Sequence, residues 1–219
     1  MTRPGLERLR GVYVLADDDP RWRNGVRTQL EGALAGGATV VQLRLKHTPD
    51  GPALELLRWA AARARAARAL CFANDRFDLA LLAGADGVHL GQDDLAPEAL
   101  PADARARLLV GLSTHTLEQA RASRARPIDY AAFGPVFATG SKPSEYEPRG
   151  CALLRQVVAL AGRPVVAIGG IGAANLAEVR AAGAAAAAVI SAVADAPDPA
   201  EATRRLQARF SAAESPPRA

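Results

Sequence analysis

Eight short apolar runs, each followed by a helix-like segment, are the feature of this sequence that most restricts its fold. The expected strands cover residues 11–16, 39–45, 70–73, 87–90, 108–112, 130–133, 164–168 and 186–190. The expected helices lie near residues 25–36, 52–69, 77–84, 97–106, 116–125, 150–161, 174–182 and 198–211. Two helix starts carry capping signatures, Thr116 with Gln119 and Asn175 with Glu178. Regular alternation of short strands with helices is typical of a parallel α/β fold.

A weak repeat indicates how many strand–helix units the chain holds. Three expected helices end at a glycine that is soon followed by alanine and an apolar run, as a C-terminal cap would be. These glycines, Gly36, Gly84 and Gly183, are 48 and 99 residues apart, which fits two and four units of about 25 residues. We therefore predict an α/β protein with one (β/α)8 TIM-barrel domain over residues 1–219, including an N-terminal extension (1–10) and a frayed tail (215–219).

Composition excludes several classes of protein. The 27 basic and 23 acidic residues give a net charge of only +4, without the basic stripe of a nucleic-acid-binding protein. Arg58, Arg63, Arg65 and Arg68 are interpreted as the solvated face of one helix, with a binding patch as the alternative. The longest apolar run, residues 181–194, is too short to span a bilayer, and the N-terminus lacks a signal-peptide core.

The cysteines favour a reducing compartment. Cys71 and Cys151 lie far apart in sequence without a CxxC partner, and Cys71 sits inside an apolar run, which predicts a buried free thiol. We therefore expect a cytoplasmic protein that binds neither nucleic acid nor membrane.

The second strand ends in a run of polar side chains. Gln42, Arg44 and Lys46 alternate along VVQLRLKH and so point to one face. Three unpaired polar groups cannot lie in an apolar barrel interior, so we expect them to line a polar cavity that suits a phosphate or carboxylate. A structural ion pair inside the barrel is the alternative. Lysine is rare here, since only Lys46 and Lys142 accompany the arginines.

Acidic residues follow the next two strands. Asp75 comes after the third strand, and Asp94, beside Asp93, comes after the fourth. Neighbouring barrel strands bring their ends together, so Asp75 and Asp94 could share Mg²⁺, which prefers oxygen ligands. Asp75 could instead cap the next helix.

Two further stretches suit anion binding. The segment 134–150 is long and rich in glycine, proline and hydroxyls, so that Thr139, Ser141 and Lys142 could form an anion clamp on a lid; a plain surface loop is the alternative. The loops after strands seven and eight are the usual phosphate site of such barrels. The candidates there are Gly169, Gly170, Ile190 and Ser191. The sequence shows no Ser/His/Asp or Cys/His constellation, which argues against acyl transfer.

Six motifs together resemble the thiamine phosphate synthase family. They are QLRLK, NDRFDLAL, ADGVHLGQDDL, GLSTHT, FGPVFATGSK and AIGGI, found in order between Gly11 and Ala194. The resemblance implies a Mg²⁺-assisted dissociative displacement that joins 4-amino-2-methyl-5-hydroxymethylpyrimidine diphosphate to 4-methyl-5-(2-phosphooxyethyl)thiazole. The products would be thiamine phosphate and pyrophosphate.

The resemblance also assigns roles to residues. The diphosphate would be held by Gln42, Arg44, Lys46 and Asn74, and Mg²⁺ by Asp75 and Asp94. Lys142 would reach the leaving group, and Ser113 would lie near the pyrimidine. The thiazole phosphate would contact Thr139, Ser141, Gly170, Ile190 and Ser191. The residues expected to act in catalysis are Arg44, Lys46, Ser113 and Lys142.

The chain departs from the family pattern in the second strand and the lid. Leu45 replaces a usual glutamate but points to the opposite face, Ser141 replaces a threonine, and the stretch PSEYEPRG is unusual. A related thiazole tautomerase is one alternative, although it tends to lack the Gln-Asp-Asp segment and to carry histidine at the position of Pro135. A non-catalytic barrel that senses thiazole phosphate or thiamine phosphate is another. The expected partners are small-molecule substrates; a homodimer is compatible with the sequence, which does not fix the oligomeric state.

Overall fold

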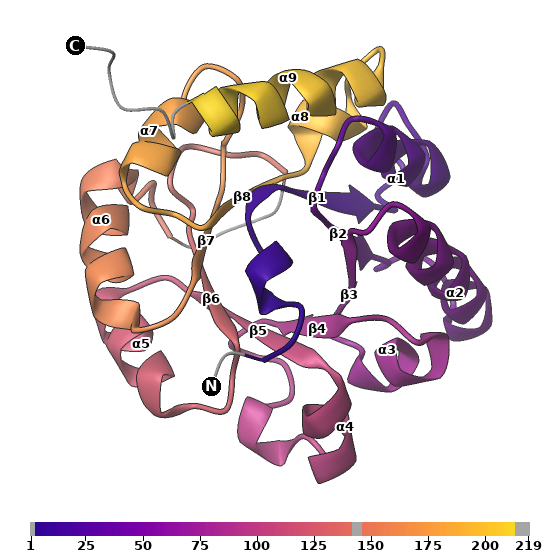
Figure 1. Ribbon diagram of the computed structural model, residues 1–219, viewed down its shortest axis with the longest axis horizontal. Helices are drawn as coiled ribbons and strands as arrows, with labels where there is room; N and C mark the ends of the chain where they lie inside the picture. The colour runs from indigo at the N-terminus through magenta and orange to yellow at the C-terminus, as the bar shows by residue number, and fades with distance from the viewer. Residues whose placement is uncertain (1–2, 142–145, 213–219) are drawn as a thin grey trace.

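The computed structural model describes residues 3–141 and 146–212, which form a closed barrel of eight parallel strands ringed by helices (Figure 1). Each strand pairs with the next, and β8 pairs with β1, so the TIM-barrel prediction is confirmed. The strands are β1 Gly11–Asp17, β2 Val40–Arg44, β3 Leu70–Asn74, β4 Gly87–Leu90, β5 Leu109–Thr114, β6 Tyr130–Phe133, β7 Val165–Ile168 and β8 Ala186–Val189. The α-helices are α1 Val26–Ala35, α2 Asp50–Ala66, α3 Phe77–Ala83, α4 Ala102–Arg107, α5 Leu117–Ala122, α6 Gly150–Ala161, α7 Leu176–Ala181, α8 Ser191–Ala194 and α9 Pro199–Ala212. The tail predicted at 215–219 and the site residue Lys142 lie outside the described residues.

Two predicted helices are divided, and one short helix was not predicted. The segment 97–106 holds a 3₁₀ turn, η2 (Pro97–Ala99), and then α4, because Pro101 lies between them and cannot continue a helix. The segment 116–125 ends in a second 3₁₀ turn, η3 (Ser123–Ala125). The four-residue helix α8 after β8 is too short to leave a periodic signal in the sequence.

The two capping predictions have different outcomes. Thr116 is the N-cap of α5, and its hydroxyl accepts a hydrogen bond from the Gln119 amide at 3.2 Å, as predicted. Asn175 is the N-cap residue of α7, as predicted, but its side chain makes no cap bond. Asn175 instead accepts from the Gly172 amide and donates to the Gly170 carbonyl, which holds the loop after β7 in shape.

An aromatic layer fills the barrel interior. Tyr13, Phe72 and Tyr130 are buried, with ring centroids 5.6 to 6.4 Å apart. Glycines on neighbouring strands make room for these rings. A Cβ atom at Gly87 would lie 2.3 Å from a Phe72 ring carbon, and one at Gly111 would lie 2.1 Å from Tyr130 Cζ. This layer closes the middle of the barrel.

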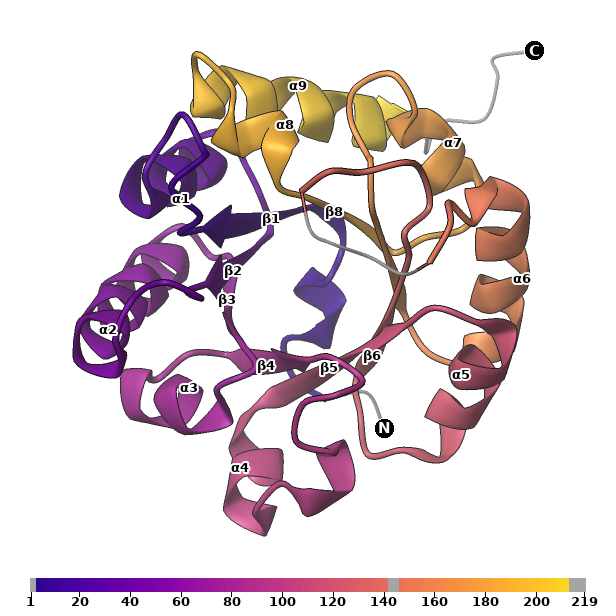
Figure 2. The ribbon, with the colours of Figure 1, turned by 180° about the vertical axis from the view of Figure 1, so that it is seen from behind.

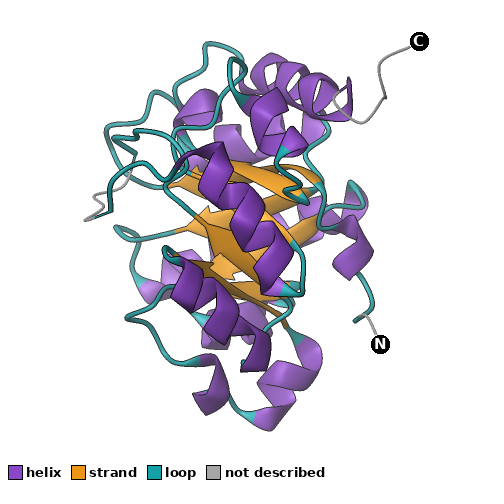
Figure 3. Cartoon of the chain, turned by 90° about the vertical axis from the view of Figure 1, so that its left-hand side faces the viewer, coloured by secondary structure: helices purple, strands orange, loops and turns teal. Residues whose placement is uncertain are grey.

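The N-terminal segment covers one end of the barrel. The 3₁₀ turn η1 (Leu6–Arg8) lies in the centre of the ring in Figure 1, and Leu6 and Leu9 are buried against the barrel interior. Long loops gather at the opposite end, at the carboxyl ends of the strands, as the side view in Figure 3 shows. A site built on this barrel is therefore expected at that opposite end.

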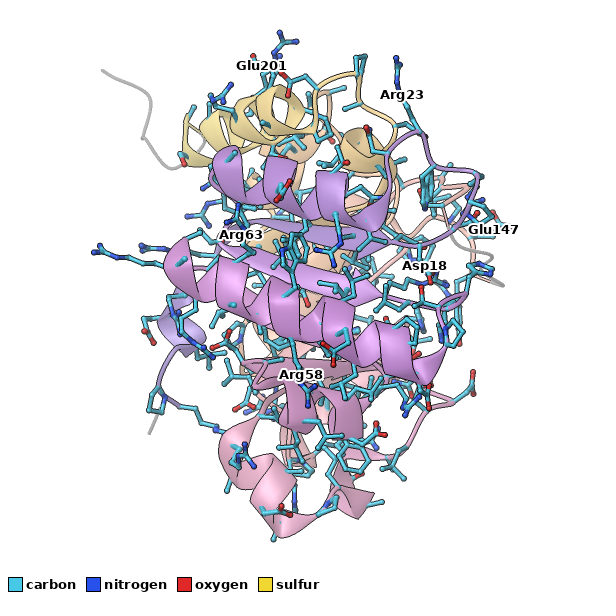
Figure 4. The ribbon with its side chains drawn as sticks, turned by 90° about the vertical axis from the view of Figure 1, so that its right-hand side faces the viewer. Asp18, Arg23, Arg58, Arg63, Glu147 and Glu201 are labelled. Atoms are coloured by element: carbon cyan, nitrogen blue, oxygen red, sulfur yellow. The ribbon has the colours of Figure 1, made fainter. Side chains whose placement is uncertain are left out.

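The arginine-rich helix face is solvated, as predicted. Arg58, Arg63, Arg65 and Arg68 are exposed along and just after α2, and Figure 4 shows Arg58 and Arg63 on its outer surface. Arg58 pairs with Glu55 at 2.7 Å within the same helix. Cys71 is a buried free thiol, also as predicted, and burial raises its pKa. No helix in the described ranges has both the length and the apolar character needed to cross a membrane.

Candidate active site

The loops that follow the strands bring the predicted site residues to one end of the barrel. In Figure 2 this end faces the viewer, and the loop between β6 and α6 passes across part of the barrel opening. Figure 4 shows Asp18 of the β1–α1 loop and Glu147 of the β6–α6 loop at this same end. We refer to this end as the mouth of the barrel.

Three predicted residues meet at the mouth. The Lys46 ammonium forms an ion pair with the Asp75 carboxylate, and the carboxyl of Asp94 lies close enough to Asp75 to be affected by its charge. Asp94 also accepts a hydrogen bond from the Gly91 amide at 2.6 Å. Burial and the neighbouring Asp75 raise the pKa of Asp94, which means that two carboxyl groups are held together at a cost in charge repulsion.

The backbone at Asp75 is unusual for a residue that is not glycine. Its φ is 62°, and its amide donates to the His89 carbonyl of β4 at 2.8 Å. Arg76, not Asp75, is the N-cap of α3, so the helix-capping alternative is wrong. A left-handed conformation at such a residue is typical of a functional position, and here it accompanies the contact with Lys46.

The donor set at Asp75 and Asp94 fits a magnesium ion. Both groups offer hard carboxylate oxygens, and bringing a divalent cation between them would relieve their repulsion. No cluster of three or more potential ligands occurs among residues 3–141 and 146–212. A two-carboxylate site is what Mg²⁺ uses when water and substrate phosphates complete its coordination.

The Arg44 side chain forms an ion pair with Asp17, an acid that the sequence analysis did not select. Its guanidinium donates to the carboxylate of Asp17 at 2.9 Å, and the Asp17 side chain is fully buried. Arg44 thus forms the ion pair that was the alternative, while its binding of an anion stays a prediction. One guanidinium nitrogen is used in this bond, so the pair fixes the direction of a side chain that still has other donors. The LADDDP run after the first strand was the signal that could have identified Asp17.

The next acid, Asp18, holds the loop that carries Lys46. Its carboxylate accepts hydrogen bonds from the amides of Lys46 and His47, at 2.8 and 2.9 Å, and from the Thr48 hydroxyl at 2.8 Å. Lys46 lies two residues beyond the end of β2, so this loop, rather than strand alternation, sets its direction. Leu45 packs against the outer core, on the opposite side from Arg44, as predicted.

A chain of hydrogen bonds crosses the barrel interior below the mouth. Gln42 Nε2 donates to the Tyr13 hydroxyl at 2.6 Å, which is 3.1 Å from the Tyr130 hydroxyl. The Tyr130 hydroxyl lies 2.9 Å from His89 Nδ1, and His89 Nε2 lies 3.0 Å from Ser113 Oγ. These five side chains come from five strands, and we call them the polar chain. Neither tyrosine carries a sequence signal that marks it as polar and functional rather than as core.

The contacts of the polar chain are compatible with one continuous direction. With the Tyr13 oxygen accepting from Gln42 and its own proton given to Tyr130, the Tyr130 proton would go to His89 Nδ1. His89 would then carry its proton on Nε2 and donate to Ser113, whose hydroxyl proton would be left for another acceptor. At the other end, Gln42 Oε1 is buried and has no hydrogen-bond partner among the described residues. In this arrangement the chain offers an acceptor at Gln42 and a donor at Ser113.

Replacing Tyr130 by phenylalanine should disconnect this chain. The Tyr130→Phe variant leaves His89 Nδ1 without its buried donor, and we expect it to lower the free energy of unfolding by about 1–3 kcal/mol. We also expect kcat/KM to fall about tenfold, because Ser113 loses its fixed direction. Thermal unfolding and steady-state kinetics measure both effects. Tyr13→Phe is the matched comparison: it keeps the Tyr130–His89–Ser113 part and should cost less activity. Equal activity of Tyr130→Phe and wild type would contradict the expectation that the polar chain orients Ser113.

The loops after β6, β7 and β8 lie close together. The Phe137 amide donates to the Gly169 carbonyl at 3.0 Å, and a Cβ atom at Gly170, where φ is 61°, would lie 2.3 Å from the Ala138 carbonyl oxygen. Glycine at position 170 therefore permits this close approach. Thr139 Oγ1 accepts from the Ser141 amide at 3.2 Å. The other two predicted phosphate-site residues, Ile190 and Ser191, lie at the start of α8.

Asn74 is the last residue of β3, beside Asp75, and its side chain is half-buried. His115 stacks on the Tyr146 ring with centroids 4.3 Å apart, and its Nδ1 lies 2.7 Å from the Gly134 carbonyl. His115 therefore helps to hold the base of the β6–α6 loop.

A parallel (β/α)8 barrel with cationic and paired acidic groups at the carboxyl ends of its strands belongs to the class of barrel enzymes that act on phosphorylated small molecules. Residues 12–193 match the family model described as thiamine monophosphate synthase. The chain is 50% identical over 210 residues to a thiamine-phosphate synthase of Anaeromyxobacter dehalogenans, covering 94% of this chain and 90% of the relative. The protein belongs to the thiamine monophosphate synthase family.

Other relatives agree with this assignment. A thiamine-phosphate synthase of Thermus thermophilus is 43% identical over 203 residues, covering 91% of this chain and 96% of the relative. The solved structure of a thiamine phosphate pyrophosphorylase from Pyrococcus furiosus matches with a TM-score of 0.86 and 35% identity. The match covers 96% of this chain and all of that one. The family resemblance predicted from the motifs is confirmed.

Proposed function

We propose that the protein is a transferase that makes thiamine phosphate and pyrophosphate from hydroxymethylpyrimidine diphosphate and thiazole phosphate. The observation that supports this most directly is the group of Lys46, Asp75 and Asp94 at the mouth of the barrel. A diphosphate needs cations and a metal ion, and Lys46 together with the two carboxylates would supply both within one cluster. The family membership and the whole-chain match to thiamine-phosphate synthases agree with this reaction.

The charged residues at the mouth would stabilise the leaving group. Arg44, at the end of β2, and Lys46, in the loop that follows, would direct donors at the diphosphate, and Asn74 at the end of β3 would add an amide. Mg²⁺ bound by Asp75 and Asp94 would neutralise negative charge that grows on the diphosphate as the carbon–oxygen bond breaks. Asp17 would keep the Arg44 guanidinium in place throughout, because a buried carboxylate fixes its partner without any reorganisation.

The polar chain supports a specific role for Gln42. The buried Gln42 Oε1 is an acceptor, so it suits an N–H donor better than an anionic oxygen of the diphosphate. We therefore propose that Gln42 accepts a hydrogen bond from the exocyclic amine of the pyrimidine, and that the Ser113 hydroxyl donates to a ring nitrogen. The ends of one hydrogen-bonded chain would then recognise a donor and an acceptor on the same ring.

The thiazole would be placed by the loops after β6, β7 and β8. Thr139, Ser141 and Gly170 lie on two of these loops, and Ile190 and Ser191 at the start of α8 complete the usual phosphate position of a barrel. Lys142, which lies outside the described residues, is proposed to reach the pyrophosphate. The attacking thiazole nitrogen has no proton to lose, so orientation rather than a strong base is what the residues must supply.

The experiment is product formation from the two purified substrates, with Mg²⁺ and with EDTA. We expect thiamine phosphate and pyrophosphate in equal amounts when Mg²⁺ is present and a near-complete loss of product with EDTA that excess Mg²⁺ restores. Folded protein that forms no product under either condition would overturn the proposal. Thiazole tautomerisation and binding of thiamine phosphate without turnover would then distinguish the two alternatives.

A homodimer and a cytoplasmic location stay predictions, and light scattering after gel filtration would test the first.

A further inference from the structure

An arginine outside the predicted site connects two loops at the mouth. Arg21 lies in the β1–α1 loop, and its Nη1 donates to the Gly140 carbonyl at 3.0 Å. Its Nη2 donates to the carbonyl of the next residue, Ser141. The two acceptors are 119 and 120 residues away in sequence and belong to the β6–α6 loop. A planar guanidinium has two parallel donors and so can hold two successive carbonyls at once.

Arg21 is itself held in position by three contacts, two with Asp19 and one with Trp22. Its amide donates to the Asp19 carboxylate at 3.0 Å, and its Nε lies 3.3 Å from the second oxygen of that carboxylate. Its Cζ atom lies 4.4 Å from the centre of the Trp22 ring, within the range of a cation–π contact. A side chain that is fixed in this way loses little further entropy when it binds the loop.

Asp19, which contacts Arg21, is linked through Asp17 to Arg44. The Asp19 amide donates to one oxygen of the buried Asp17 carboxylate at 3.0 Å. The other Asp17 oxygen accepts from Arg44 at 2.9 Å. Asp17 thus fixes Arg44 through its side chain and the support of Arg21 through a backbone amide. One buried acid sets the geometry of the anion site and of the arginine that holds the loop.

The segment that Arg21 holds has few other ties. Within residues 3–141 and 146–212, no other hydrogen bond joins residues 139–141 to a different part of the chain. The Ser141 amide bonds to Thr139, within the same loop. The base of the loop is fixed elsewhere, by the amides of Val136 and Phe137 bonding to the β7 end. Among the described residues, Arg21 is therefore the side chain whose hydrogen bonds join this segment to another part of the chain.

We propose that Arg21 is a positioning residue that holds Thr139 and Ser141 over the mouth so that they can bind the thiazole phosphate. It contacts the loop backbone rather than the substrate, so it acts through these two residues. The identity of the substrate in this proposal rests on the proposed function. The contact between Arg21 and the β6–α6 loop does not rest on it.

The test is Arg21→Ala, with Arg23→Ala as the matched control. Arg23 lies in the same loop, but its side chain is exposed and points away from the barrel in Figure 4. We expect Arg21→Ala to raise the KM for thiazole phosphate about tenfold, while the KM for the pyrimidine diphosphate changes less than twofold and kcat less than threefold. Tenfold corresponds to about 1.4 kcal/mol. Arg21→Lys should show a smaller rise in the KM for thiazole phosphate than Arg21→Ala, because the lysine ammonium can still donate to one of the two loop carbonyls.

Hydrogen–deuterium exchange gives a readout that does not depend on turnover. Peptides that cover residues 136–141 should exchange faster in Arg21→Ala than in Arg23→Ala, while peptides from α2 exchange equally. Equal exchange in the two variants, or faster exchange with no selective rise in the KM for thiazole phosphate, would overturn the proposal. If the wild-type protein made no thiamine phosphate, the proposed function would fail, and the exchange comparison would still decide whether Arg21 holds the loop.

Discussion

Asp94→Asn is expected to lose activity without losing stability. The amide can still accept from the Gly91 amide, but it removes a negative ligand from the proposed metal site, so we expect kcat/KM to fall about a hundredfold to a thousandfold. The same change removes a carboxyl group whose pKa is raised by burial and by the neighbouring Asp75, so it also removes the repulsion between the two carboxyl groups. The melting temperature in EDTA should therefore stay equal to that of the wild type or rise.

Magnesium should have different effects on the melting temperatures of the wild type and of Asp94→Asn. Mg²⁺ binds the folded state, so it should raise the melting temperature of the wild type and leave that of Asp94→Asn almost unchanged. Asp93→Asn is the matched control, because Asp93 is adjacent in sequence and exposed. It should keep its activity and its response to Mg²⁺. Activity of Asp94→Asn within threefold of wild type would show that Asp94 is not a metal ligand of this reaction.

Gly87→Ala should produce the largest loss of stability. The new methyl group would lie 2.3 Å from a Phe72 ring carbon and 2.5 Å from the Leu109 carbonyl oxygen of the neighbouring strand. Neither neighbour can move freely, because Phe72 packs at 5.6 Å, edge to face, against Tyr130 in the closed barrel. We expect a loss of about 3 kcal/mol or more in the free energy of unfolding, since overpacking in a dense core forces side chains and backbone to shift.

Thermal unfolding followed by circular dichroism measures this effect. A loss of this size corresponds to a fall of about 6–12 °C in the melting temperature of a domain of roughly this length. Gly51→Ala is the matched control, since no atom lies within 4 Å of its Cβ position and it sits in the first turn of α2. Alanine there should be neutral or slightly stabilising. A melting temperature of Gly87→Ala close to that of Gly51→Ala would mean that the aromatic layer can adjust.

Some properties of the site follow from the order of residue types along the chain. Apolar runs followed by Asp, Lys or Gly mark the carboxyl ends of strands, and these ends meet at one edge of any parallel barrel. This pattern is sufficient to predict that Lys46, Asp75 and Asp94 lie together, as they do at the mouth. Where periodicity is weak, the prediction fails: Pro101 divides a helix, and Asn175 resembles a cap but binds within its own loop.

The sequence by itself determined the eightfold alternation, the family and the residues at the strand ends, because these depend on local pattern and chain order. The tertiary structure decided how deep each side chain lies and what it meets across the barrel. Strand alternation places Gln42 and Arg44 on one face, but only the register in which β1 pairs with β2 brings Tyr13 to Gln42 and Asp17 to Arg44. The bond from Arg21 to Gly140 likewise joins loops that are distant in sequence. Such contacts depend on the relative placement of whole elements, which side-chain periodicity within one element does not encode.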